Sequence, residues 1–209
     1  MVAIGTALLW FGWYGFNAGS ELAVNAITVS AFLNTDTSAS FAAVTWLIIE
    51  WNVGNKKPTF IGLMTGAVAG LATITPAAGF VDIYASALIG IIAAIGCYLA
   101  VQFKERKGWD DALDVWGVHG MGGVIGTILL GFFANSAINP AIPNGIFYGG
   151  DGMLLFKEVV AIIIAIVYAF GFTIGILKLI NKFTPVKVSI SEEKEGLDMA
   201  FHGEIARQI

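Results

Sequence analysis

The sequence predicts an all-α membrane protein whose chain crosses the bilayer several times. Hydrophobic residues make up 57% of its 209 residues and charged residues only 12%, about half the charged share of a typical soluble domain. The mean hydropathy of +0.80 agrees with this class. The long charge-free stretches are residues 1–20, 58–81, 83–103, 115–150 and 159–177. Each is near or above the length of about 20 residues that a spanning helix needs, and none shows the alternation of a barrel strand.

Six spanning helices fit these stretches and the polar segments between them. We expect them at residues 2–18, 25–50, 58–79, 83–103, 114–134 and 153–181. Together they form a transmembrane domain over residues 1–183, and the polar residues 184–209 form a cytoplasmic tail.

The charges of the loops predict the orientation of the chain. The basic residues of the loops on one side are Lys56, Lys57, Lys104, Arg106 and Lys107. The opposite loops contain the acids Glu21, Asp82 and Asp151. Because basic loops face the cytoplasm, we expect a multi-pass protein of the cell membrane with both termini in the cytoplasm.

The first span ends in an aromatic run, WFGWYGFNAGS at residues 10–20. Trp13, Phe16 and Ser20 are related by i, i+3 and i+7, so they share one face of a helix. Aromatic faces attract cations, and a serine oxygen accepts hydrogen bonds from them. This face is therefore a candidate cation-binding site, with an interfacial aromatic belt as the alternative.

The second span is the least regular, because it contains Asn34 and Asp36 near its middle. A buried carboxyl group is costly without a partner. We therefore expect Asp36 to be protonated or hydrogen-bonded, or to lie in a wet crevice. Two further acids, Glu50 and Asp114, lie near predicted helix ends. We interpret both as structural, with Asp114 placed to cap the fifth span.

Small residues characterise the third and fourth spans. Gly62, Gly66 and Gly70 are spaced by four, which predicts close contact with a neighbouring helix. The pair Thr75-Pro76 is expected to break or kink the third span near its end. Cys97, the single cysteine, lies among apolar neighbours and is interpreted as a small core side chain.

The fifth span contains His119, the only histidine within a predicted span. An ionisable group inside a membrane lines a cavity or pairs with another group, and a neutral imidazole offers one donor and one acceptor. Gly122, Gly123 and Gly126 leave the same side of the helix without bulk, so another element or a narrow lumen can lie against the imidazole. The alternatives are a histidine hydrogen-bonded between helices and a haem ligand.

The residue pattern contains no enzyme constellation and no cluster of metal ligands, so we expect neither catalysis nor a cofactor. The basic residues mark one membrane face and form no stripe for nucleic acid. A membrane redox subunit that binds haem or a quinone is the alternative from another class. A haem subunit usually needs a second axial ligand in a span, and His202 lies in the tail.

Four motifs occur in order along nearly the whole chain. They are WYGFNAGS at 13–20, GAVAGL with TPAAG at 66–79, DVWGVHG at 114–120, and EGLD at 195–198 followed by HGE at 202–204 and Ala206. In this order they resemble the ammonium transporters of the Amt/Rh family. The resemblance implies a homotrimer of eleven-span subunits, each with a pore between two inverted five-helix repeats. This chain resembles spans six to eleven, an incomplete Amt/Rh-type fold made of the second repeat plus the last helix.

The resemblance also implies roles for the candidate residues. Phe16 matches an aromatic gate below an ammonium-recruitment site, and Ser20 matches a hydroxyl of that site. Trp13 matches a pore-lining indole, and His119 matches the second of a pair of pore histidines. The tail matches the segment that interacts with PII-type signal proteins.

The implied function is ammonium transport: recruitment of ammonium, its deprotonation and conduction of ammonia through an apolar pore. Because the first repeat and its histidine have no counterpart, we expect the isolated chain to be inactive or to need an N-terminal half. We expect the chain to be a truncated fragment, a pseudogene product or half of a split transporter. An ammonium sensor or PII-binding membrane protein without transport is the alternative.

Overall fold

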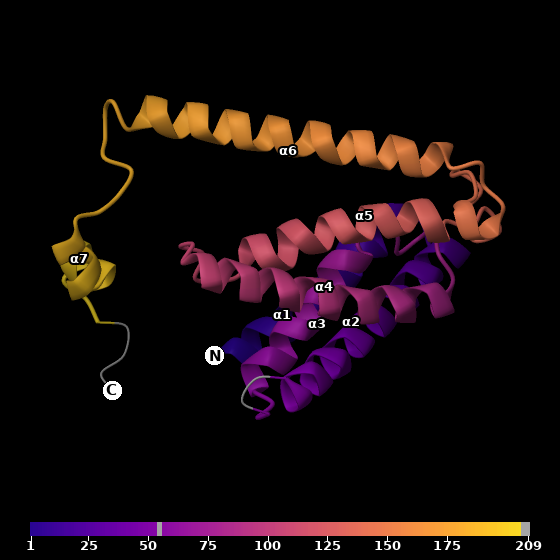
Figure 1. The fold of residues 1–209 in the computed structure, drawn as a ribbon, viewed down its shortest axis with the longest axis horizontal. Helices are drawn as coiled ribbons and strands as arrows, with labels where there is room; N and C mark the ends of the chain where they lie inside the picture. Colours follow the sequence, from indigo (N-terminus) through magenta and orange to yellow (C-terminus); the bar gives the residue numbers. More distant parts are fainter. Residues whose placement is uncertain (54–55, 206–209) are drawn as a thin grey trace. The chain divides into compact units, whose positions relative to one another are not determined.

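The computed structural model describes residues 1–53 and 56–205, and helices are their only regular elements. The six long helices are α1 (Val2–Asn17), α2 (Ala26–Asn52), α3 (Phe60–Ile74), α4 (Ile83–Lys107), α5 (Met121–Phe133) and α6 (Met153–Ile180) (Figure 1). The short elements are the 3-10 turns η1 (Gly19–Glu21) and η3 (Ile146–Tyr148), the π-helical turn η2 (Val115–Gly120), and helices α7 (Ile190–Glu195) and α8 (Leu197–His202). The chain divides into two compact units, residues 1–162 and 163–209.

Each predicted span overlaps one of the long helices, and the ends differ for local reasons. Helix α3 stops at Ile74, because Thr75-Pro76 begins a series of turns, as the sequence predicts. Helix α4 extends to Lys107, beyond the predicted end at residue 103, and Gly108 closes it with a left-handed φ of 64°. Three helical segments, Ile83–Lys107, Val115–Phe133 and Met153–Ile180, are long and apolar enough to cross a membrane. The six-span topology stays a prediction.

Glycines bring α2, α3 and α4 into backbone contact. A Cβ at Gly70 would lie 2.5 Å from the carbonyl oxygen of Ser38, and one at Gly66 would lie 2.5 Å from the Cβ of Trp46. A Cβ at Gly90 of α4 would lie 3.0 Å from the Cα of the same Ser38. The glycine spacing in the third span therefore predicted a close helix contact correctly. The core formed around this crossing includes Cys97, which is fully buried as expected.

Polar side chains hold the ends of these helices. Asn34 donates hydrogen bonds to the carbonyls of Ala78 and Val81, at 2.8 and 2.7 Å, and so fixes the turn between α3 and α4. Glu50 accepts hydrogen bonds from the Thr59 amide and hydroxyl, which confirms its structural role.

The N-terminus of α4 is tied to the loop that precedes α6. Asp82 accepts the amides of Tyr84 and Ala85 as the N-cap of α4, and its other oxygen accepts the phenol hydrogen of Tyr148. This hydrogen bond to a carboxylate raises the pKa of the Tyr148 phenol above its usual value. The tyrosine therefore stays protonated, and the tie stays closed, at neutral pH.

The tail is more ordered than the polar composition indicated. Ser189 and Glu192 form a reciprocal capping box at the start of α7, with the Ser189 amide donating to the Glu192 carboxylate over 2.7 Å. The hydrogen bonds from Ser189 hold the pKa of Glu192 below its usual value. Gly196 then separates α7 from α8. Ala206, which the tail motif includes, lies outside the described residues.

Candidate functional site

Three of the predicted site residues are in contact: Trp13 and Phe16 of α1, and His119 of η2. The Trp13 indole stacks on the His119 imidazole, with ring centroids 6.1 Å apart and planes inclined by 18°. Phe16 approaches the same indole edge-on, at 5.9 Å and 61°. Trp13 is half-buried, whereas Phe16 and His119 are exposed on this unit. The arrangement joins residues that are about a hundred positions apart in the sequence.

The Trp13 ring is held in place by the end of α3. Its Nε1 donates to the Thr75 hydroxyl over 2.8 Å, and that hydroxyl in turn donates to the carbonyl of Leu71. From the sequence, Thr75 is predicted only to take part in a helix break. Its position beside a proline at the end of a span gave no sign of this second contact, which depends on the packing of α1 on α3.

Ser20 lies one turn beyond the rings, in η1. Its Oγ donates to the carbonyl of Phe16 over 2.5 Å, so the lone pairs of the hydroxyl remain available. Together with Phe16 it borders a cavity of about 210 Å³. Glu21, Thr75 and Asn139 also line this cavity, which gives it a polar side.

Cavities follow α1 along its length. Beyond the one at Ser20, a groove of about 290 Å³ runs along Leu9, Trp13 and Phe16. A third cavity, about 330 Å³, includes Leu9 and His119. Phe16 borders the first and second and Leu9 the second and third, so the three are neighbours in a row along α1. Apart from polar groups at its two ends and His119, this row is apolar.

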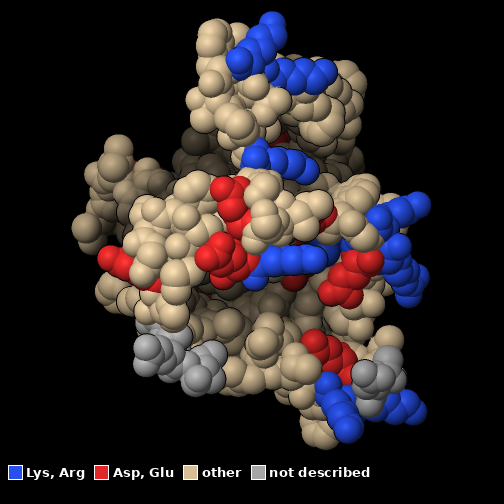
Figure 2. Space-filling view, turned by 90° about the vertical axis from the view of Figure 1, so that its left-hand side faces the viewer, with Lys and Arg blue, Asp and Glu red and all other residues tan. Residues whose placement is uncertain are grey.

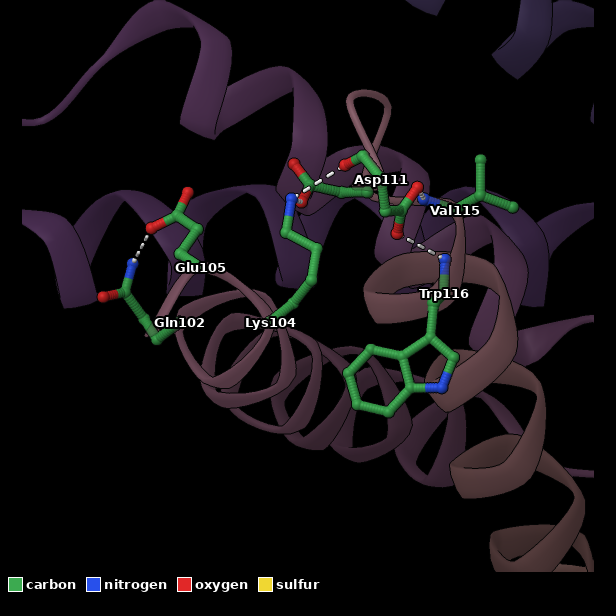
Figure 3. A network of polar contacts seen from close by, with 7 residues as sticks. Gln102, Lys104, Glu105, Asp111, Val115 and Trp116 are labelled. Atoms are coloured by element: carbon green, nitrogen blue, oxygen red, sulfur yellow. Dashed lines mark hydrogen bonds and ion pairs between the residues drawn. The ribbon is translucent and has the colours of Figure 1, made fainter. Parts of the chain in front are cut away.

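The turn that carries His119 is anchored by polar contacts from the end of α4 (Figure 3). Lys104 Nζ lies 2.6 Å from Asp114 Oδ1 and donates to the carbonyl of Asp111 over 2.8 Å. The Asp111 carboxylate accepts the amides of Val115 and Trp116, each at 2.9 Å. The prediction that Asp114 caps this helix is therefore wrong. Asp114 has a left-handed φ of 54° and pairs with Lys104, and Asp111 caps η2 instead.

Replacing Asp111 with alanine is expected to loosen η2. Two amides at the start of the turn lose their acceptor, a loss comparable to removing an N-cap, which costs about 1–2 kcal/mol. Thermal unfolding in detergent should show this destabilisation, with faster hydrogen exchange at Val115 and Trp116. Asp110→Ala, which removes an exposed neighbouring acid, is the control. Equal stability of the two variants would contradict the capping role.

The sequence predicted that the glycines near His119 lie on the same side of the helix as the imidazole. In the structure they do not lie on one side together. Gly122 and Gly126 contact Thr73 of α3, whereas a Cβ at Gly123 would meet no atom within 4 Å. Another element does lie against the imidazole, as expected, but it is Trp13 of α1.

The Asp36 carboxyl group accepts hydrogen bonds, which is one of the outcomes expected for an acid in a span. Trp10 Nε1 and the Tyr14 hydroxyl both donate to Asp36 Oδ1, at 3.2 and 2.5 Å. These two donors are not among the residues predicted to contact Asp36. They lie in α1, four residues apart on one helix face, with Trp13 between them in the sequence. This spacing in the sequence indicates that both can donate to one acceptor.

The charge on the surface does not favour a nucleic acid. The face in Figure 2 bears Lys and Arg as well as Asp and Glu side chains. Neither sign of charge covers this face alone, whereas a nucleic-acid interface needs a basic one.

Comparisons with known proteins agree on one family. The sequence profile described as Ammonium Transporter Family matches residues 1–207. An ammonium transporter from Bacillus subtilis (strain 168) is 46% identical over 206 residues, which are 98% of this chain and 50% of that protein. Ammonium transporter Amt1 from Archaeoglobus fulgidus is 43% identical, over 99% of this chain and 51% of that protein. The chain thus spans about half the length of the curated relatives it matches.

Solved structures show the same likeness in three dimensions. Saccharomyces cerevisiae Mep2 superposes with a TM-score of 0.86 at 32% identity, over 90% of this chain and 43% of that chain. A structure described as a sensor Amt protein has a TM-score of 0.85 at 32% identity, over 96% and 48% of the two chains. The predicted all-α transporter fold is therefore confirmed for the part that the chain covers.

Proposed function

The chain belongs to the ammonium transporter family, and we propose that it moves ammonium across the cell membrane along the aromatic face of α1. The observation that carries the proposal is the stack of Trp13 on His119, with Phe16 edge-on to the same indole. The row of cavities along α1 supports it, because neighbouring cavities share the side chains of Phe16 and Leu9.

We propose that ammonium is recruited at Ser20. The Phe16 ring offers a face to a cation, the Ser20 hydroxyl keeps its lone pairs, and the Glu21 side chain borders the same cavity. These groups replace part of the hydration shell that ammonium loses. With the orientation expected from the loop charges, this end of the path faces outward.

Beyond Phe16 the path is too apolar for a charged solute, because a charge in a membrane interior is expensive. We propose that ammonium gives up its proton there and continues as ammonia. The His119 imidazole offers one donor and one acceptor to ammonia and can exchange a proton. Potassium has no proton to lose, so the same path would reject it.

A homotrimer is the proposed assembly, and a PII-type signal protein is the proposed partner of the tail. The ordered pair α7 and α8 supports the second proposal, because it presents a defined surface. An ammonium sensor without transport is the second candidate function, favoured by the likeness to a structure described as a sensor Amt protein.

Uptake of labelled methylammonium separates these functions. The protein is expressed in a bacterium without ammonium transporters, alone and together with the part of the Bacillus subtilis relative that it does not match. We expect uptake above the vector control in at least one arm, with competition by ammonium and none by potassium.

No uptake in either arm, with the protein present in the membrane, would contradict transport. Co-purification of the host PII protein in that case would favour the sensor.

A further inference from the structure

We propose that Asp36 is a positioning residue that fixes the rotation of α1 about its own axis and so aligns Trp13 with His119. The inference rests on the proposed function for its consequence, because the aligned rings border the proposed ammonium path. The contacts that carry it are independent of that function.

Helix α1 is attached to its neighbours by a ladder of side-chain hydrogen bonds. The donors occupy positions i, i+3, i+4 and i+7 of one helix face, namely Trp10, Trp13, Tyr14 and Asn17. Asp36 accepts from two of them, Thr35 accepts from Asn17 over 2.9 Å, and Thr75 accepts from Trp13. Asp36 is thus the only acceptor of the ladder that serves two donors.

Close packing contributes little to this attachment. Thr6 is the only buried residue of α1. A Cβ at Gly5, Gly12 or Gly15 would meet no atom within 4 Å. The glycines of α3, by contrast, lie against the backbone of α2. Because close packing of α1 is sparse, the directional hydrogen bonds are the main constraint on its rotation.

Asp36 is the strongest acceptor in the ladder. A carboxylate makes shorter and stronger hydrogen bonds than a hydroxyl, and the low dielectric of a membrane strengthens them further. Its two donors, Trp10 and Tyr14, are one turn apart and flank Trp13. The Tyr14 ring also stacks on Phe32 of α2, with centroids 4.1 Å apart. Rotation of α1 would break both bonds and move the Trp13 indole away from Thr75 and His119.

Three variants test the proposal in the full chain. Asp36→Leu removes the acceptor, Asp36→Asn keeps one neutral acceptor oxygen, and Tyr14→Phe removes one donor. Thr37→Val changes the next residue of α2 and serves as the control. Methylammonium uptake in the arm that transports gives KM, and proton NMR of the purified protein gives the shift of the His119 ring. His119 and His202 are the only histidines, so the assignment is direct.

We expect KM to rise about fivefold in Asp36→Leu and less in the other two variants, because misplaced groups bind the solute less well. The His119 ring protons, shifted upfield by the stacked indole, should move toward their position in Trp13→Leu. A role in stability alone would lower the amount of folded protein and leave KM and this shift unchanged.

The two proposals fail separately. Unchanged KM and unchanged His119 shift in folded Asp36→Asn and Tyr14→Phe would overturn the positioning role while transport stands. Absence of uptake by the unaltered protein would overturn transport, and the NMR shift would still decide the role of Asp36.

Discussion

Replacing Gly126 with alanine should destabilise the protein by about 2 kcal/mol or more, within the range of overpacking in a filled core. The new Cβ would overlap the carbonyl oxygen of Thr73 and lie 2.8 Å from its carbon and 3.1 Å from Pro76 Cγ. The oxygen and carbon belong to the backbone at the end of α3, so no side chain can rotate to make room. The clash exceeds the gain of about 1 kcal/mol in helix propensity.

Gly123→Ala is the matched control for this change. It lies in the same helix, less than one turn away, and its Cβ would meet no atom within 4 Å. We expect this variant to be as stable as the unaltered protein or more so. Thermal unfolding in detergent should therefore rank Gly126→Ala well below Gly123→Ala, and equal midpoints would show that α5 does not press against α3 at this point.

Replacing His119 with alanine should reduce methylammonium uptake by about tenfold or more, which corresponds to about 1.4 kcal/mol of lost stabilisation. Three cavities form the row along α1. Among the residues that line them, only Glu21, next to Ser20, and His119 are titratable. Removal of the imidazole leaves ammonia without a polar partner at the middle of the path. The Trp13 indole also loses its stacking partner.

Uptake in the transporting arm, normalised to folded protein, measures this effect. His119→Gln keeps hydrogen bonding but cannot titrate, so it shows whether proton exchange matters. Glu105→Gln changes an exposed side chain at the end of α4 and is expected to leave uptake unchanged. If His119→Ala retained full uptake and ammonium selectivity, the histidine would have no part in conduction.

Local patterns predicted the helices, one face of α1 and the close packing of α3, but not the side-chain contacts that join α1 to the other helices. The i, i+3 relation of Trp13 and Phe16 follows from helix geometry, and so the sequence shows it. The approach of His119 depends on how η2 lies beside α1, which no local rule specifies. The position of Asp114 immediately before the helix predicts a cap, but its side chain makes no cap hydrogen bond. The left-handed backbone at that residue turns its side chain to Lys104, and Asp111 takes its place.

Two patterns in the sequence predict contacts that the structure contains and that were not expected above. Ser189 and Glu192 have the spacing of a capping box, which marks the start of α7. Trp10 and Tyr14 have the spacing that lets both donate to one acceptor. Their acceptor, Asp36, was recognised as a residue in need of a partner, but the partner's identity required the packing of α1 on α2.

The crossing of three helices at Ser38 has a consequence for motion. Gly70 and Gly90 both meet the backbone of this residue, and the Ser38 hydroxyl donates to the carbonyl of Gly70 over 3.0 Å. Closely packed backbones resist sliding, because there are no side chains between them that can change rotamer. Helices α2, α3 and α4 should therefore move as one rigid body on the timescale of a transport cycle. Helix α1, attached by side-chain hydrogen bonds, can move relative to this body only when those bonds break.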